Sequence, residues 1–268
     1  MNTSLLELSV FLDIVEANFL EQDNVLELIK CEKHFDTPVP DAYSVYRPLA
    51  TATLSALLGE YILDLKAKLH LLRDYLNGLA FLSEQKGVMH RDIKPANVAV
   101  MSLDQPKDII LDLDAATTEQ YSRDHTKGTV LYLAPEVMDL KEMISTKTSV
   151  PYTKAIDVWA MGLSAFAIHS GKPFRWHYFE GLARPRSGSV TKRLHGEFCR
   201  RLLSDIARTT DSSKRAMLKA IELMTEYKSD RRISAADALK IIEDATEDNG
   251  DRGSIVKRMA SKRMRTDS

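Results

Sequence analysis

The segment AIDVWAMGLSAFAIHSG, residues 155–171, constrains the fold more strongly than any other stretch of this chain. It has the length of a helix, and its apolar side chains occur nearly all round instead of along one stripe. A helix of this kind has to be covered on every side, so it must lie in the middle of a domain. The chain has 268 residues, which is enough for one or two domains with a sizeable core.

Further helices are expected around this centre. Residues 4–20 carry an apolar stripe at helical spacing, and residues 52–86 predict a long amphipathic helix. In the second range leucines recur every three or four positions: Leu65, Leu69, Leu72, Leu76 and Leu79. Gly87 stands where that helix would stop. Residues 234–245 predict another amphipathic helix.

Short strands are expected in three places. Residues 24–35 and 42–49 contain strand-like runs, and a turn marked by two prolines separates them. Residues 97–112 contain the runs VAVM and IILDL, joined by a turn at DQPKD. The chain is therefore predicted to fold as an α+β protein.

Composition and charge exclude several classes of protein. Hydrophobic residues make up 44% and charged residues 28%, which is ordinary for a soluble globular protein. The net charge of −1 gives no sign of a nucleic-acid or membrane partner. The two cysteines, Cys31 and Cys199, form neither a disulfide framework nor a CxxC pattern, so a reducing compartment is expected. Each is interpreted as a buried thiol, with a reactive thiol as the alternative.

The two ends of the sequence bear on localisation. The first residues lack a basic leader and carry acidic interruptions, so neither a signal peptide nor a transmembrane helix is expected there. We therefore expect a cytoplasmic or nuclear protein and not a secreted one. Residues 251–268 are basic, and KRMASKRMR fits a nuclear-localisation or nucleic-acid patch. The simpler interpretation of this tail is a solvated, disordered segment.

One short segment gathers three polar groups suited to phosphoryl transfer. In HRDIKPAN, residues 90–97, Lys94 follows Asp92 by two positions and Asn97 follows it by five. The Asp92 carboxylate can accept or orient the proton of an attacking hydroxyl. Lys94 can neutralise charge on a transferred phosphoryl group. The amide oxygen of Asn97 suits a hard cation such as Mg²⁺.

The pattern H-R-D-x-x-x-x-N resembles the catalytic loop of the eukaryotic protein kinases, and the lysine two positions after the aspartate resembles their serine/threonine branch. The resemblance covers roughly residues 5–245. It implies a complete, mainly helical large lobe at 49–247, and a partial small lobe of one helix and about two strands, with the hinge, at 1–48. Residues 248–268 remain as a tail.

LDLD, residues 111–114, stands where the family has D-F-G. The resemblance implies that Asp112 holds the Mg²⁺ ion that bridges the nucleotide phosphates. Leu113 replaces phenylalanine, which is an apolar swap. Asp114 replaces glycine, and aspartate adopts a positive φ less readily than glycine does.

KGTVLYLAPEV, residues 127–137, resembles the G-T-x-x-Y-x-A-P-E segment of the family. It implies that Thr129 forms hydrogen bonds near Asp92 and Lys94. Thr126, just before it in the activation segment, is the best candidate phosphosite. A phosphate there would pair with Arg91 and order the loop; the alternative is an ordinary polar loop residue.

The resemblance also assigns structural roles to several residues of the large lobe. Glu136 is expected to pair with an arginine late in the lobe, for which Arg232 is the candidate. DVWAMG resembles the buried helix of the family, so Asp157 is expected to anchor the backbone of the catalytic loop. His90 and Arg91 complete the structural set.

The glycine-rich loop and the ATP-binding lysine of the family are not found in this chain. The glycines before the catalytic loop are Gly59, Gly78 and Gly87, and none forms G-x-G. The first lysine is Lys30, which falls in a strand after the first predicted helix. Glu7 in that helix matches the glutamate of the family. Its lysine partner is therefore expected upstream of Met1, in an N-terminally truncated small lobe.

ATP and Mg²⁺ are the cofactors that the resemblance implies. YSVYRP, residues 43–48, would form the hinge that meets adenine through Val45 and Tyr46. Ala99 and Leu111 are the other nucleotide-binding candidates.

Two functions remain open on the sequence alone. The first is a serine/threonine protein kinase, since Asp92, Lys94, Asn97 and Asp112 are all present. The second is a pseudokinase that acts as a binding or scaffold module, because the glycine loop and its lysine are absent. A small-molecule kinase is disfavoured by the APE segment, which shapes a docking site for protein substrates in the family. Neither the protein substrate nor the oligomeric state follows from the sequence.

Residues 172–212 lie where the family varies and docks partners. Trp176, Tyr178 and Phe179 are candidate surface anchors. The alternative is that these aromatic side chains pack on the lobe.

Overall fold

The computed structural model describes residues 24–25, 27–34, 41–47, 50–142, 151–176, 188–246 and 252–258. The predicted helix at 4–20, with Glu7, lies outside these residues, and so do Tyr178 and Phe179.

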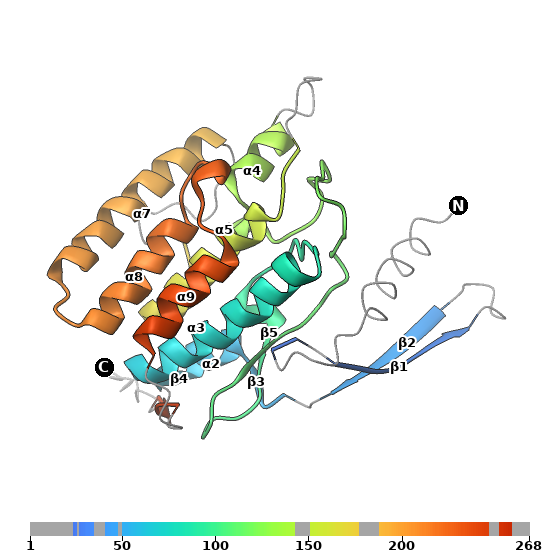
Figure 1. Ribbon diagram of the computed structural model, residues 1–268, viewed down its shortest axis with the longest axis horizontal. Helices are drawn as coiled ribbons and strands as arrows, with labels where there is room; N and C mark the ends of the chain where they lie inside the picture. The colour runs from blue at the N-terminus through green and yellow to red at the C-terminus, as the bar shows by residue number, and fades with distance from the viewer. Residues whose placement is uncertain are drawn as a thin grey trace, which may run out of the picture.

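The predicted buried helix forms the centre of the molecule. It is α5 (Ala155–Ser170), and every side chain from 156 to 168 is buried in it. α3 (Leu65–Ala80) and α8 (Ser212–Met224) pack against α5, and α9 (Ala235–Ala245) packs against both α3 and α8 (Figure 1). The complete cover explains why this helix carries no polar stripe.

Further helical segments belong to the large lobe. They include α4 (Pro135–Glu142), α7 (Gly188–Arg208) and the 3₁₀ turns Pro95–Asn97, Val130–Tyr132 and Ser229–Arg231. No helix in the described part of the chain combines the length and the apolar composition needed to cross a membrane.

The single long helix predicted over 52–86 is wrong in its first third. That stretch contains β3 (Ala52–Thr53), α2 (Leu54–Glu60) and β4 (Tyr61–Leu63) before α3 begins. The break occurs because Asp64 caps a new helix: its Oδ1 accepts the N–H of Ala67 at 2.7 Å. The leucine stripe then lies on α3 as expected, and a π turn at Phe81–Gln85 follows it before Gly87, whose φ is 66°.

The two strands predicted within 97–112 form a hairpin. β5 (Val98–Val100) pairs with β6 (Asp108–Ile110), and β3 pairs with the other edge of β5. The catalytic segment enters the hairpin at Asn97 and the chain leaves it toward Asp112, so both residues lie at its open end.

The N-terminal strands form a second, antiparallel hairpin. β1 (Glu27–His34) pairs with β2 (Asp41–Arg47), with a bulge between Leu28 and Lys30. Figure 1 shows this hairpin standing to one side of the helical body. Val45 and Tyr46 belong to the paired part of β2, so the expected hinge at 43–48 begins within a strand.

Part of the C-terminal tail is ordered, and the prediction of a disordered tail is wrong for residues 252–258. β7 (Ile255–Lys257) pairs with β4 in an antiparallel two-stranded sheet. The arginine side chains on either side of β7, which the composition suggested would be solvated, bond to the large lobe instead.

Candidate active site

A buried carboxylate on α5 fixes the start of the catalytic segment. The two oxygens of Asp157 accept the backbone N–H groups of His90 and Arg91 at 2.7 and 2.8 Å. Arg91 has a φ of 66°, a left-handed conformation that is uncommon for arginine. Burial raises the pKa of Asp157, while the charge of His90 and the two backbone hydrogen bonds oppose this rise. Two charge-assisted hydrogen bonds thus hold a strained turn in place.

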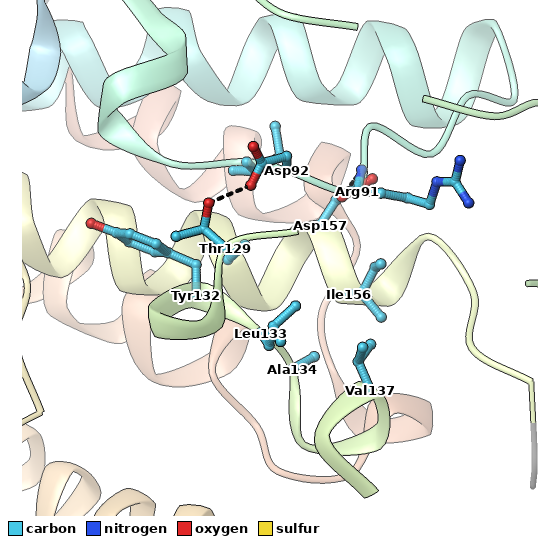
Figure 2. Close-up of a pocket in the computed structure, with 11 residues that line it drawn as sticks. Arg91, Asp92, Thr129, Tyr132, Leu133, Ala134, Val137, Ile156 and Asp157 are labelled. Atoms are coloured by element: carbon cyan, nitrogen blue, oxygen red, sulfur yellow. Dashed lines mark hydrogen bonds between the residues drawn. The ribbon is translucent and has the colours of Figure 1, made fainter. Parts of the chain in front are cut away.

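Three side chains converge just beyond this turn. Thr129 donates its hydroxyl hydrogen to Asp92 Oδ1 at 2.7 Å, as Figure 2 shows. The ammonium group of Lys94 lies 2.6 Å from Asp92 Oδ2 and 2.9 Å from the Thr129 hydroxyl oxygen. The predicted contact of Thr129 with Asp92 and Lys94 is therefore present. The Asp92 carboxylate is held at both oxygens, so its orientation is fixed.

Asn97 joins the same cluster from the 3₁₀ turn. Its Nδ2 donates to the Asp92 carbonyl oxygen at 3.0 Å and to Asp92 Oδ2 at 3.2 Å. Both contacts use the amide nitrogen, which leaves the amide oxygen available to a cation.

The backbone places Asp112 beside this asparagine. The N–H of Leu111 donates to the Asn97 carbonyl oxygen at 2.9 Å, and the Leu111 carbonyl oxygen accepts from His90 Nε2 at 2.9 Å. His90 is fully buried. Both backbone polar groups of Leu111 are therefore hydrogen-bonded. Asp112, which follows it, has an exposed side chain and a φ of 63°.

The Asn97 amide oxygen and the Asp112 carboxylate are the donor set that a hard divalent cation prefers. The described residues contain no group of three or more His, Cys, Asp or Glu side chains that would bind a metal by themselves. Two protein oxygens supplemented by water and nucleotide phosphates are the usual arrangement for Mg²⁺, so these residues fit such an ion.

The expected penalty at Asp114 does not arise. Among the non-glycine residues that the structure describes, only Arg91 and Asp112 have a positive φ. The strained position in this segment is therefore two residues before the one where the family has glycine. Asp114 sits in an ordinary turn, with an exposed side chain.

Arg91 contacts a carboxylate that the sequence did not single out. Its Nη1 lies 3.8 Å from Asp124 Oδ2, and its Nε donates to the Ala115 carbonyl oxygen. Asp124 also accepts from the backbone N–H of Thr126 at 2.9 Å and from the Thr126 hydroxyl. Although partial burial opposes the change, the Thr126 hydrogen bonds and the Arg91 charge lower the pKa of Asp124. No pattern marked Asp124, because an acidic residue in a loop is common.

The Thr126 side chain is exposed, and its role as a phosphosite stays a prediction. The carboxylate of Asp124 already occupies the position beside Arg91 in which a phosphate was expected.

The ion pair expected between Glu136 and Arg232 is formed. Arg232 Nη1 lies 2.8 Å from Glu136 Oε1, and Nη2 lies 3.1 Å from Oε2. The arginine side chain is completely buried and lies over the Trp159 ring, 5.2 Å from its centroid. This bidentate pair ties α4 to the segment before α9.

Two hollows flank the cluster. The one in Figure 2, between Asp92 and the side chains of Leu133, Val137 and Ile156, has a volume of about 10 Å³, so it is a packed seam. The second is an open groove of about 800 Å³ lined by Lys94, Thr129 and Arg175, among others. It borders the catalytic cluster and is large enough for several residues of an extended chain.

The remaining predicted residues fall in less informative places. Ala99 is buried in the middle of β5, and the side chains of Val45 and Tyr46 are not among those described. Their nucleotide-binding role, and that of Leu111, stays a prediction.

Trp176 packs on the lobe and is not a surface anchor: it is 1% exposed, and its Nε1 donates to the Leu131 carbonyl oxygen at 3.1 Å. Burial raises the pKa of the Cys199 thiol to about 11, which favours the unreactive interpretation.

The fold and the cluster together define a protein kinase domain, and comparison with known proteins agrees. The family model for the protein kinase domain matches residues 14–241. The chain belongs to the protein kinase family.

Individual relatives are similar over shorter stretches. The chain is 35% identical over 106 residues to calcium/calmodulin-dependent protein kinase type 1 of Caenorhabditis briggsae, which is 39% of this chain and 27% of that protein. It is 29% identical over 193 residues to the dual serine/threonine and tyrosine protein kinase of Xenopus tropicalis, which is 69% of this chain and 20% of that protein. The chain thus spans about a quarter or less of the length of these relatives.

Proposed function

We propose that this domain transfers the γ-phosphoryl group of ATP to a serine or threonine hydroxyl of a protein. The observation that carries the proposal is the cluster in which Thr129 and Lys94 hold the Asp92 carboxylate at both oxygens. Catalysis of phosphoryl transfer depends mainly on positioning and electrostatic stabilisation, so a carboxylate fixed in this way is suited to the task.

Each side chain of the cluster has a separate task. The Asp92 carboxylate accepts a hydrogen bond from the attacking hydroxyl and takes up its proton as the new bond to phosphorus forms. The Lys94 ammonium group, 2.6 Å from Asp92, supplies positive charge where negative charge develops on the transferred group. Thr129 keeps Asp92 from rotating away from the substrate.

Mg²⁺ is the cation that we assign to Asn97 and Asp112. When bound, the ion neutralises the charge on the nucleotide phosphates and orients them. This chain contributes the amide oxygen of Asn97, whose nitrogen already bonds to Asp92. It also contributes the exposed carboxylate of Asp112, whose neighbour Leu111 is held by two hydrogen bonds at its backbone.

The groove beside Lys94 and Thr129 supports a protein as the substrate. Its volume of about 800 Å³ opens directly onto the cluster, so an extended peptide could place a hydroxyl near Asp92. The sequence similarity to a dual serine/threonine and tyrosine protein kinase supports a protein hydroxyl as the acceptor.

The test is radiolabel transfer from ATP with Mg²⁺ to a generic protein substrate by the full chain, together with nucleotide-induced stabilisation. We expect Asp92→Asn to lower transfer by about 100-fold or more while nucleotide binding persists. The matched control is Asp230→Asn, an exposed carboxylate in a 3₁₀ turn, which should leave transfer unchanged. Undiminished transfer in Asp92→Asn would refute the assignment. If the chain showed neither transfer nor stabilisation by nucleotide, the kinase proposal would fail and a binding role would replace it.

A further inference from the structure

The C-terminal segment 252–258 lies in a groove that is built entirely from the large lobe. Its floor comes from α3 between its cap residue Asp64 and Asp74, from β4, from the turn between β5 and β6, and from the end of α5. The catalytic residues lie at the open end of the β5–β6 hairpin, whereas this groove uses the turn at its other end. It is therefore separate from the catalytic cluster.

One end of the groove is a pocket for a guanidinium group. Arg252 Nη2 donates to Asp74 Oδ2, and Nε donates to the Pro106 carbonyl oxygen at 2.6 Å. The nearby Asp108 is fully buried, and neither of its carboxylate oxygens has a hydrogen-bond partner among the described residues. A mostly buried carboxylate and a backbone carbonyl oxygen that both accept from the same guanidinium favour an arginine at this position.

The middle of the groove contacts the backbone of the segment and its two small residues, Gly253 and Ser254. Asp64 Oδ2 accepts the backbone N–H of Ser254 at 2.8 Å and its hydroxyl hydrogen at 2.7 Å, while Oδ1 caps α3. Gly253 has a φ of 82°, and a Cβ atom built there would lie 2.3 Å from the backbone nitrogen of Ala67. Only glycine fits at this point.

The far end holds a second arginine through backbone carbonyl groups. Arg258 Nε donates to the Tyr61 carbonyl oxygen at 3.0 Å, and Nη2 donates to that of Gly171 at 2.5 Å. The backbone N–H of Arg258 donates to the Glu60 carbonyl oxygen at 2.8 Å. Between the two arginines, the side chains of Val256 and Lys257 are exposed, so the groove does not select for them.

We propose that this groove is a recognition site for an extended Arg-Gly-Ser-Ile-x-x-Arg segment, in which the isoleucine packs against the core. Residues 252–258 occupy the groove in cis, and the groove exchanges them for a segment of the same chemistry supplied in trans. The carboxylates of Asp74 and Asp64 and the fit around Gly253 define this chemistry. Exchange follows from the structure of the occupant: β7 is a three-residue strand in a two-stranded sheet, which is marginally stable by itself. The proposal does not depend on catalytic activity.

Binding in trans tests the exchange directly. The probe is a fluorescent peptide with the sequence of residues 250–260, added to the full chain and to the full-length double variant Arg252→Ala, Arg258→Ala. In the unmodified chain the tethered segment competes at an effective concentration on the order of millimolar. We therefore expect the peptide to bind the double variant about tenfold or more tightly than the unmodified chain. Equal binding to the two proteins, or to neither, would overturn the proposal.

Matched peptides test which side chains the groove reads. Peptides with Arg252→Ala or Gly253→Ala should bind the double variant about tenfold or more weakly, because one loses the charge-assisted bonds and the other meets the α3 backbone. The peptide with Lys257→Ala is the control and should bind as the unchanged peptide does. Equal binding of all four peptides would mean that the groove attracts basic peptides without recognising this pattern.

Hydrogen exchange provides a second test within the full chain. Asp64→Asn keeps an oxygen that can cap α3 but turns an amide NH₂ group toward the N–H of Ser254. We expect the amide of Ser254 to exchange about tenfold or more faster, while the amide of Ala67 keeps its protection. Unchanged exchange at Ser254 would show that Asp64 does not hold the segment.

Discussion

Asp157 Oδ1 accepts the backbone N–H of Arg91 at 2.8 Å, across 66 residues of sequence, at the point where Arg91 adopts a left-handed φ of 66°. The other carboxylate oxygen accepts the N–H of His90. The buried centre of the large lobe and the catalytic segment are therefore joined by one side chain. A backbone conformation that costs energy persists because its two amide groups are paired inside the core.

Asp157→Asn tests this link. Asparagine keeps one acceptor oxygen but turns an NH₂ group toward one of the two backbone amides, which leaves that amide unpaired. We expect the free energy of unfolding to fall by about 2 kcal/mol, and phosphoryl transfer to fall further than the loss of folded protein explains. Denaturant unfolding and an activity assay on the folded fraction measure the two effects. If stability fell while activity per folded molecule stayed constant, Asp157 would support the core alone.

The Thr129 hydroxyl donates to Asp92 and accepts from Lys94, whereas its methyl group makes neither bond, so substitutions can separate the two groups. Thr129→Ala should lower the turnover rate by roughly tenfold to a hundredfold, the equivalent of one hydrogen bond to a charged group. Thr129→Ser keeps the hydroxyl and should stay close to the unmodified rate. Steady-state kinetics at saturating ATP measure both. A serine variant as impaired as the alanine variant would show that the methyl group, and not the hydrogen bond to Asp92, matters.

The buried ion pair between Glu136 and Arg232 is expected to contribute far more to the free energy of unfolding than an exposed ion pair does. Glu136→Ala leaves the fully buried Arg232 guanidinium without its counter-charge, which should cost about 3–5 kcal/mol. The matched control is Glu222→Ala, which breaks an exposed pair with Lys219 and should cost less than about 1 kcal/mol. Denaturant unfolding measures both. Equal losses would mean that the buried arginine finds water or another acceptor.

Asp124 is predicted to order the activation segment without a phosphate. Asp124→Ala removes the carboxylate that contacts Arg91 and that accepts two hydrogen bonds from Thr126. The amide of Thr126 should then exchange faster by about tenfold, because its acceptor is gone. Hydrogen exchange measures this, with Glu119→Ala, an exposed residue of the same segment, as the control. Unchanged exchange in Asp124→Ala would show that other contacts order the segment.

The sequence predicted those parts of the structure that depend on local patterns or on short motifs. Helix α5 was predicted because a segment that is apolar all round has only one stable environment. The pairing of Thr129 with Asp92 followed from motifs in a fixed order. Each of these rests on residue types that have few alternative uses.

The sequence could not predict contacts between elements that no motif connects. Nothing local distinguished Arg252 from the other basic residues of the tail, because its partners, Asp74 and the Pro106 carbonyl, are set by the packing of α3 against the β5–β6 turn. The sequence also did not predict that the helix is interrupted at Asp64, because leucines continue the helical spacing on both sides of it. A single capping side chain decided the outcome there.

The buried carboxylate of Asp108 makes a prediction about pH. Burial raises its pKa well above the usual 3.8, and the neighbouring Asp74 adds to this rise while Arg252 opposes it. A raised folded-state pKa means that the folded protein holds this proton more tightly than the unfolded chain does. The contribution of Asp108 to stability is therefore fully present below about pH 3.8 and is lost as the pH rises through the folded-state value.

Asp108→Asn removes this dependence, because asparagine carries no charge to bury. At pH 7 the variant should be more stable than the unmodified protein by about 1 kcal/mol or more, and the difference should shrink as the pH is lowered toward 4. Urea unfolding at a series of pH values measures it, with the exposed Asp230→Asn as the control that should show no comparable trend. A variant that is less stable at pH 7 would contradict this prediction. It would mean that the attraction between the Asp108 carboxylate and Arg252 stabilises the fold by more than the burial of that carboxylate costs.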